Sequence, residues 1–248
     1  MRVAIAGGTG LAGGLVADEA RARGHETALL ARSTGVDLTT GAGLDDALNG
    51  ADAVIDVTNV DTLKADASTT FFERATRTLL AGEQRAGVGR HVALSIIGVD
   101  RAPFDYYAGK RAQEMAIEVG SVPWTILRAA QFHEFAQQIY ATAKAGPLHL
   151  APKMRTQPIA AREVASRLVD LAESPARGGY IELAGPREEE LVDMVRRWAR
   201  AQGHRGWIPE IPLPGALGRA QRAGTLLPRD GAEIGSETFA AWLERTSN

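Results

Sequence analysis

The feature that most constrains the fold is a regular alternation in the first 145 residues. Short runs rich in β-branched and other apolar residues alternate with longer segments rich in alanine, leucine and arginine. The short runs are continuously apolar, as expected of strands that are covered on both faces. They predict strands at residues 3–6, 27–31, 36–38, 53–57, 91–97 and 124–127. This order is typical of strand–helix–strand units around a parallel sheet, so the sequence predicts a doubly wound α/β fold.

The longer segments have the composition and length of helices. They span residues 11–23, 69–85, 106–119 and 131–144. Gly24, Gly87 and Gly146 follow three of them, where a glycine commonly ends a helix. The strand–helix order therefore extends to about residue 145.

The composition of the chain changes after Gly146, since 9 of the 11 prolines lie beyond this residue. Shorter elements are expected there: helices at residues 161–173, 188–202 and 238–245, and strands near 180–183 and 207–212. We therefore divide the chain into an α/β domain at residues 1–146 and a cap region at 147–248 that is partly interleaved with it.

Composition excludes several kinds of site. The chain has 248 residues and no cysteine, so disulfides, thiolate metal sites, iron–sulfur clusters and cysteine nucleophiles are excluded. The five histidines are scattered, and no two have the four-residue spacing of a helical zinc pair. We therefore expect no metal site.

Charge and hydropathy indicate the kind of partner. The formal net charge is -2 and only 6% of the residues are aromatic, which argues against a nucleic-acid surface. No run approaches about 18 apolar residues, and Arg2 leads directly into a predicted strand. We therefore expect a cytoplasmic protein whose partner is a small-molecule substrate, without nucleic acid or membrane. Composition specifies no oligomeric state.

A glycine-rich turn joins the first predicted strand to the first predicted helix. Gly7, Gly10 and Gly13 follow one another at three-residue spacing. A glycine turn at this place lets the backbone approach a pyrophosphate, whose charge is met by N–H groups at the start of the helix. The context favours dinucleotide binding over the alternative, a purely structural turn.

The end of the second predicted strand indicates which dinucleotide is bound. An NAD site usually places an acid on the ribose 2′-hydroxyl about 20 residues after the glycine motif, whereas a 2′-phosphate needs a cation. Arg32 stands 19 residues after Gly13, and Ser33 and Thr34 add hydroxyl groups. A guanidinium suits a phosphate, so NADP(H) is favoured over NAD; the alternative is a solvated loop arginine.

Ser95, Tyr106 and Lys110 form the candidate catalytic group. Ser95 lies near the end of the predicted strand 91–97, and Tyr106 and Lys110 share one face at the start of the next helix. A lysine ammonium beside a phenol lowers the pKa of the phenol, which can then give a proton to a carbonyl oxygen as hydride arrives. In the alternative, Tyr106 is a packing residue and Lys110 only binds the nicotinamide ribose.

Three segments carry a resemblance to a known family. They are Gly-Gly-Thr-Gly-Leu-Ala-Gly at residues 7–13, Tyr-Tyr-Ala-Gly-Lys-Arg-Ala-Gln-Glu at 106–114 and Pro-Trp-Thr-Ile-Leu-Arg-Ala-Ala-Gln-Phe-His-Glu-Phe at 123–135. The chain resembles the NmrA-like, NAD(P)H-binding group of atypical short-chain dehydrogenases/reductases over its whole length, including residues 157–159, 183–186 and 238–243. The resemblance implies a Rossmann-type doubly wound parallel sheet with a small C-terminal substrate-binding cap, and usually NADP(H).

The resemblance also implies roles for individual residues. The pyrophosphate would be held by Gly7, Thr9, Gly10, Leu11 and Gly13. The rest of the cofactor would be held by Arg32 and Ser33 at the 2′-phosphate, Asp37 and Leu38 at the adenine, Lys110 at the ribose, and Ala129, Ala130, Gln131 and Phe132 at the nicotinamide. The group contains both reductases and cofactor-sensing regulators, so the resemblance indicates the cofactor better than the chemistry.

The chain departs from the better-studied short-chain reductases near the tyrosine. Tyr106 follows Ser95 by only 11 positions, and no helix asparagine completes a proton relay. Tyr107 is therefore a second candidate that can exchange roles with Tyr106. We expect the substrate between the carboxyl ends of the strands and the cap, beside Tyr107, Phe132 and His133. A lone histidine beside phenylalanines is, however, more often a packing residue.

The leading hypothesis is an NADPH-dependent oxidoreductase that reduces a carbonyl, a quinone or a similar unsaturated small molecule. Tyr106 would donate the proton, Lys110 would hold the ribose and Ser95 would hold the reacting oxygen. Two alternatives stay open: an NADP(H)-sensing regulatory protein without turnover, and a non-redox enzyme such as an epimerase or dehydratase.

Overall fold

A seven-stranded parallel sheet lies at the centre of the protein, whose computed structural model describes residues 1–247. In sheet order the strands are β13 (Glu233–Ile234), β10 (Gly179–Ala184), β5 (Trp124–Ala129), β4 (Arg90–Ile96), β3 (Ala53–Asp56), β1 (Arg2–Ala6) and β2 (Glu26–Leu30). The chain passes from β1 to β2 on one side and then to β3 on the other side of β1. The turn after β1 therefore lies where the strand order reverses, which is where ligands bind in such sheets.

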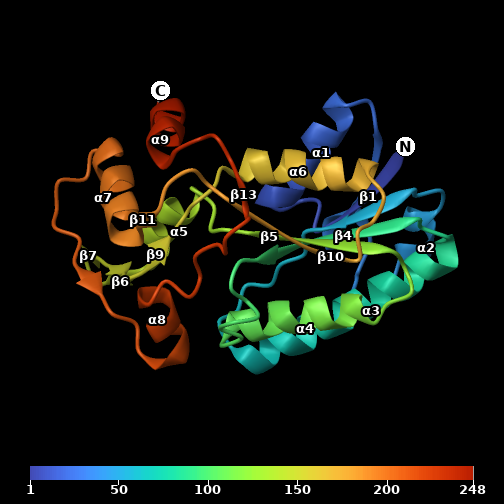
Figure 1. The fold of residues 1–248 in the computed structure, drawn as a ribbon, viewed down its shortest axis with the longest axis horizontal. Helices are drawn as coiled ribbons and strands as arrows, with labels where there is room; N and C mark the ends of the chain where they lie inside the picture. Colours follow the sequence, from blue (N-terminus) through green and yellow to red (C-terminus); the bar gives the residue numbers. More distant parts are fainter. Residues whose placement is uncertain (248) are drawn as a thin grey trace.

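Helices cover both faces of the sheet (Figure 1). One face carries α1 (Leu11–Ala22) and α6 (Ala161–Glu173), and the other carries α3 (Ala65–Ala86) and α4 (Tyr106–Glu118). A short helix, α2 (Leu44–Leu48), packs against α3 and β2. Because side chains alternate along a strand, β1 supplies both halves of the core: Val3 and Ile5 pack with α1 and α6, and Ala4 and Ala6 pack with α3. This arrangement confirms the predicted doubly wound α/β fold.

The remaining elements gather beyond the carboxyl ends of the strands, on the left of Figure 1. The helices there are α5 (Phe135–Thr142), α7 (Leu191–Ala201), α8 (Gly215–Arg222) and α9 (Phe239–Ser247). They are joined by the two-residue strands β6 (Lys144–Ala145), β7 (Leu148–His149), β8 (Ala151–Pro152), β9 (Arg155–Thr156), β11 (Glu189–Glu190) and β12 (Glu210–Ile211). Their own core includes Met154, Leu191, Met194, Phe239 and Trp242. No helix within residues 1–247 is both long and apolar enough to cross a membrane.

The predicted strand at residues 36–38 is wrong. This segment does not join the sheet and makes only an isolated bridge between Asp37 and Ala42. Gly35 turns the chain with a φ of 85°, and Asp37 Oδ1 accepts hydrogen bonds from both the backbone N–H and the hydroxyl of Thr39. These local bonds fold the segment into a turn, since short polar side chains compete with strand pairing for the backbone.

The other predicted strands of the first half correspond to β1, β2, β3, β4 and β5, and the predicted helix 161–173 coincides with α6. The helix predicted at 131–144 begins only at Phe135, because Phe132 first forms a bridge with Ile159. The sequence did not predict α2, α8 or β13. Elements after residue 146 also complete the sheet, since β10, β13 and α6 all belong to its layers. Asn248, the last residue of the predicted cap region, lies outside the described residues.

Candidate functional site

The glycine turn after β1 is closely packed on its inner side. Gly7 has a φ of 77°, and a β-carbon there would come within 2.8 Å of the Val57 carbonyl oxygen. A β-carbon on Gly13 would overlap the carbonyl oxygen of Gly7. The turn can therefore form only with glycine at these two positions.

The outer side of the same turn is open. Thr9, Gly10 and Leu11 are exposed, and a β-carbon on Gly10 would meet only the Gly7 carbonyl oxygen, at 3.5 Å. Gly10 is the N-cap residue of α1 and offers no side-chain acceptor to the N–H groups at the start of the helix. The first turn of the helix also carries no acidic residue. Free N–H groups at a helix start attract an anion. The turn therefore fits the pyrophosphate of a dinucleotide.

The residues predicted at the ribose follow β2 in a 3-10 turn, η1 (Arg32–Thr34). Arg32 and Ser33 are exposed, and within residues 1–247 the Arg32 guanidinium has no carboxylate partner. The Thr34 hydroxyl is already used, because it donates to the Leu29 carbonyl and accepts from the Ala31 N–H. Arg32 and Ser33 can therefore meet a 2′-phosphate, whereas Thr34 serves the turn itself.

Asp37 and Leu38, predicted at the adenine, belong to the turn that replaces the expected strand. The hydrogen bonds from Thr39 lower the pKa of the Asp37 carboxyl, and Leu38 is almost buried. Asp37 Oδ1 is therefore committed to Thr39, and Oδ2 is the atom of this carboxylate that remains for a ligand.

Tyr106 lies at the same edge of the sheet as the glycine turn. Its hydroxyl donates to Asn59 Oδ1 at 2.6 Å. Asn59 follows β3 in the loop whose Val57 carbonyl packs against Gly7. One short loop therefore connects the phenol to the glycine turn at residues 7–13, the cradle proposed for the pyrophosphate. Sequence reasoning missed Asn59; the available signal was a polar residue just past the carboxyl end of a buried strand.

Lys110 does not reach Tyr106. Its side chain is only 4% exposed, and Nζ donates to the Leu94 carbonyl at 2.7 Å and to Gln113 Oε1. Burial lowers the pKa of Lys110 to about 8, against the opposing effect of Asp56 and Glu114. The pKa of Tyr106 is raised, mainly by burial and also by Tyr107. The prediction that Lys110 lowers the phenol pKa is therefore wrong, because the ammonium points into the core.

Ser95 is also turned away from the tyrosine. It is 2% exposed, and its hydroxyl donates to Glu114 Oε1 at 2.7 Å. Glu114 in turn accepts from Arg128 Nε at 2.8 Å and from Arg128 Nη2 at 2.7 Å. Ser95 therefore belongs to a buried ion-pair network under α4, and the structure does not bring it to Tyr106 or to an open surface.

Of the nicotinamide and substrate residues predicted at the end of β5, one bonds to Tyr107 and the others are wholly or partly buried. Gln131 Nε2 donates to the Tyr107 hydroxyl at 2.7 Å, and burial raises the pKa of Tyr107. Ala129, the last residue of β5, and Ala130 are buried, and Phe132 packs partly against the sheet core. His133 is completely buried against Phe239 and Trp242 and bonds to the Glu237 carbonyl at 3.1 Å. His133 is thus a packing residue and not, as predicted, a substrate contact.

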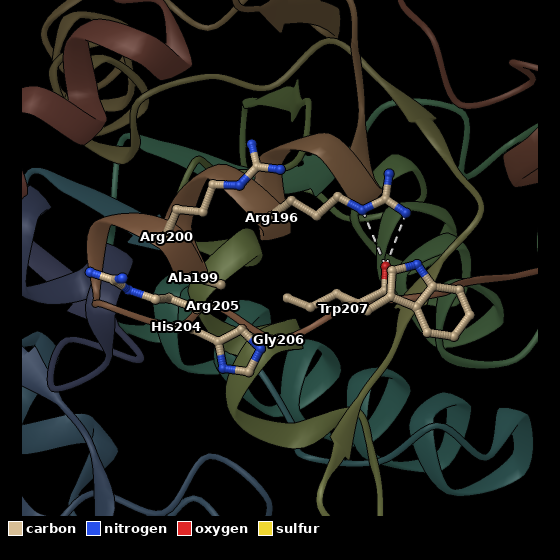
Figure 2. A pocket seen from close by; sticks show the side chains of 8 residues that line it. Arg196, Ala199, Arg200, His204, Arg205, Gly206 and Trp207 are labelled. Atoms are coloured by element: carbon tan, nitrogen blue, oxygen red, sulfur yellow. Dashed lines mark hydrogen bonds between the residues drawn. The ribbon is translucent and has the colours of Figure 1, made fainter.

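A hollow lies elsewhere, on the cap at the end of α7 (Figure 2). It measures about 370 Å³ and is lined by Arg196, Ala199, Arg200, His204, Arg205, Gly206, Trp207 and Ile208. Arg196 is tied to the Ile208 carbonyl at 3.0 Å, and in Figure 2 the guanidinium groups of Arg196 and Arg205 point in opposite directions. Because its polar groups do not converge, this hollow is not the candidate active site.

Comparison with known protein families supports NAD(P)H binding, as the geometry of the glycine turn does. Residues 7–175 match the model of a family described as NAD(P)H-binding. No curated protein matches the chain.

Several solved structures share the fold. The NADPH complex of the quinone oxidoreductase QOR2 from Escherichia coli has a TM-score of 0.74 at 16% identity, over 99% of this chain and 100% of that one. A short-chain dehydrogenase/reductase superfamily protein from Agrobacterium tumefaciens, with bound NAD, has a TM-score of 0.71 at 18% identity, over 100% and 96%. The UDP-N-acetylglucosamine 4-epimerase from Bacillus cereus has a TM-score of 0.72 at 16% identity, over 100% and 95%. At such identities the likeness shows the fold alone.

Proposed function

The chain belongs to the NAD(P)H-binding family, and we propose that it is an NADPH-dependent oxidoreductase that reduces a carbonyl, a quinone or a similarly unsaturated small molecule. The observation that carries the proposal is the place of the Tyr106 hydroxyl, bonded to Asn59 in the loop that packs against the glycine turn. In this proposal residues 1–146 hold the cofactor, and the region 147–248 covers the substrate while also completing the sheet.

NADPH is proposed over NADH because of Arg32. This exposed guanidinium, with the hydroxyl of Ser33 beside it, follows β2 where an NAD site would carry an acid. The planar donor fork of arginine suits a phosphate.

The proposed reaction needs a hydride at carbon and a proton at oxygen. NADPH held at the glycine turn would supply that hydride, which would go to the carbon of the substrate C=O group. A phenol ordinarily titrates near pH 10, and burial raises the pKa of Tyr106 further, so it is protonated at neutral pH and can donate its proton to the substrate oxygen. From an aldehyde or a ketone the product is an alcohol. From a quinone the same addition gives a hydroxydienone, which becomes the hydroquinone when the carbon that received the hydride loses a proton and the second oxygen takes one up.

The surroundings of Tyr106 favour an apolar substrate. Leu63 is 82% exposed in the loop after β3, and Phe104 is 40% exposed two residues before Tyr106. Exposed apolar side chains on both loops that flank a candidate site favour a flat, apolar ligand such as a quinone. The fold shared with the Escherichia coli quinone oxidoreductase supports the same substrate class.

An epimerase or dehydratase is the second candidate, because the Bacillus cereus epimerase shares the fold to the same extent. Such enzymes first remove a proton from a hydroxyl group, which needs a base. Lys110 is turned away from Tyr106, and burial keeps this phenol protonated. The site therefore favours proton donation, as reduction requires.

The test is to incubate the protein with NADPH and a panel of quinones, aldehydes and ketones while nicotinamide absorbance is followed. We expect turnover that is faster with NADPH than with NADH. Tyr106→Phe should lower kcat by about 10²- to 10⁴-fold with unchanged NADPH affinity. Tyr140→Phe is the matched control, because the Tyr140 ring packs in the cap, stacked on His149 and edge-on to His204.

Two outcomes would contradict the proposal. Conversion of a sugar nucleotide without net loss of NADPH would show a non-redox enzyme. Tight NADPH binding without turnover on the whole panel would show an NADP(H)-sensing protein.

A further inference from the structure

We propose that Asn59 is a positioning residue for Tyr106, and that its side-chain oxygen, rather than Ser95 or Lys110, holds the phenol hydroxyl in place. The inference rests on the proposed function, because it concerns the proton donor of that reaction. It begins from the hydrogen bond between Tyr106 and Asn59, which joins α4 to the loop after β3.

The direction of this hydrogen bond follows from the backbone. Asn59 Oδ1 accepts from the Val60 N–H at 2.8 Å as well as from the Tyr106 hydroxyl at 2.6 Å. A backbone N–H can only donate, so the amide atom facing it is the oxygen. Tyr106 is therefore the donor, and a neutral amide dipole holds its proton.

The other two residues of the candidate catalytic group, Ser95 and Lys110, are engaged elsewhere. Ser95 donates to Glu114, and Lys110 donates to the Leu94 carbonyl and to Gln113. Within residues 1–247, the Tyr106 hydroxyl has Asn59 as its hydrogen-bond partner.

The loop that carries Asn59 is itself braced from below. Asp56, buried at the end of β3, accepts from the Thr58 N–H at 2.9 Å and from Gln113 Nε2 at 2.8 Å. Gln113 Oε1 accepts in turn from Lys110. Lys110 therefore acts on the tyrosine indirectly, through Gln113 and Asp56, by supporting the loop from which Asn59 reaches Tyr106.

The backbone of Tyr106 is held independently. Its carbonyl accepts from the Ser68 hydroxyl of α3 at 2.9 Å, and a β-carbon on Gly109 would overlap Ser68. Asp105, just before α4, has a φ of 51°, in the region that L-residues rarely adopt. With the main chain held by α3 and the hydroxyl by Asn59, the phenol has one orientation before substrate arrives.

The experiment compares Asn59→Leu and Asn59→Asp with the unmutated protein. Asn59→Leu removes the acceptor and should lower kcat by about tenfold to hundredfold, with NADPH affinity changed by less than about threefold. Asn59→Asp keeps an acceptor for both donors and should recover part of kcat. In the Tyr106→Phe background Asn59→Leu should have no further effect on kcat, because the two residues act together. Asn49→Leu, at an exposed asparagine after α2, is the matched control.

A second measurement does not depend on turnover. With tyrosines labelled at ring carbon Cζ, the nuclear magnetic resonance signal of Tyr106 should move in Asn59→Leu, while those of the other three tyrosines stay in place. This movement in a protein that turns over no substrate would reject the proposed function but support the role of Asn59. The inference would be overturned if Asn59→Leu left either the Tyr106 signal or kcat unchanged. Weakened NADPH binding with unchanged kcat would also overturn it, and would make Asn59 a cofactor ligand.

Discussion

The glycine turn and the tyrosine lie at the same edge of the sheet, but they are built in different ways. The turn comes from one short segment, residues 7–14, and presents main-chain N–H groups. The tyrosine depends on side chains from three segments: Asn59 after β3, Ser68 on α3, and Tyr106 itself on α4.

This difference decides how far each part can be understood from local sequence. A backbone cradle needs only that glycine stands where a β-carbon would clash, as at Gly13. A side-chain constellation depends on which neighbours each residue meets after packing. Ser95 and Lys110 have the residue types of a catalytic pair, but both are buried in networks beneath α4.

The largest expected effect on NADPH binding tests the glycine turn. Gly13→Ala would put a methyl group onto the Gly7 carbonyl oxygen, so NADPH binding should fall by about 100-fold or more. Gly14→Ala is the matched control, because a β-carbon there meets nothing within 4 Å. Gly14 lies inside α1, where a change from glycine to alanine should raise stability by about 0.5–1 kcal/mol. Calorimetric titration measures the NADPH affinities of the two variants, and urea unfolding measures their stabilities. Equal NADPH affinities of Gly13→Ala and Gly14→Ala would contradict the proposed role of the turn.

The second prediction tests the network beneath the tyrosine. Glu114→Ala leaves Arg128, which is 3% exposed, without its bidentate partner and should lower the free energy of unfolding by about 3–5 kcal/mol. Glu118→Ala, one turn later in α4, removes a more exposed pair with Arg111 and should cost less than about 1 kcal/mol. Urea unfolding measures the stabilities of the two variants. Similar losses of unfolding free energy would show that the buried network stabilises the protein no more than the exposed pair does.

The third prediction concerns pH. Burial lowers the pKa of Lys110 to about 8 from its ordinary 10.5, so between these values the unfolded chain binds a proton that the folded protein does not. The contribution of Lys110 to stability should therefore rise with pH above about 8, by about 1.4 kcal/mol per unit. Unfolding free energies measured at several pH values should show this slope relative to Lys110→Met. A difference independent of pH between 8 and 9.5 would contradict the lowered pKa of the buried lysine.

A smaller expected effect on NADPH binding tests cofactor choice. Arg32→Ser should weaken NADPH binding by about tenfold to hundredfold, which corresponds to about 1.5–3 kcal/mol for a charged hydrogen bond, and leave NADH binding unchanged. Arg205→Ser on the cap, also an exposed arginine, should change neither. Equal affinity of the unmutated protein for both cofactors would contradict the proposed preference.

Periodic segments were the most predictable part of the fold. The helix predicted at residues 161–173 coincides with α6, because one continuous apolar face packs on the sheet and α1. The strand predicted at 36–38 failed because the bonds between Asp37 and Thr39 replace pairing in the sheet. The strand β13 has only two residues, too few to show a period.

The candidate site was predictable where one residue type fulfils one local requirement. The residue types at Gly7, Gly13 and Arg32 are legible in the chain, because a turn that excludes β-carbons and a cation after β2 have chemical meaning before folding. His133 carried no such signal, since an imidazole can serve a substrate or a core equally well. Its burial against Phe239 and Trp242 brings together residues about 100 positions apart.

The doubly wound sheet and the glycine cradle thus follow from the order and the types of residues along the chain, because both depend on local backbone geometry and on apolar periodicity. The partners of the polar side chains were decided only by tertiary packing. Ser95 faces Glu114, Lys110 faces Leu94, and Tyr106 faces Asn59 because the register of β4 and the close approach of α3 and α4 determine which side chains meet. Hydrogen bonds act over about 3 Å, so a residue's role depends on neighbours that sequence spacing cannot specify.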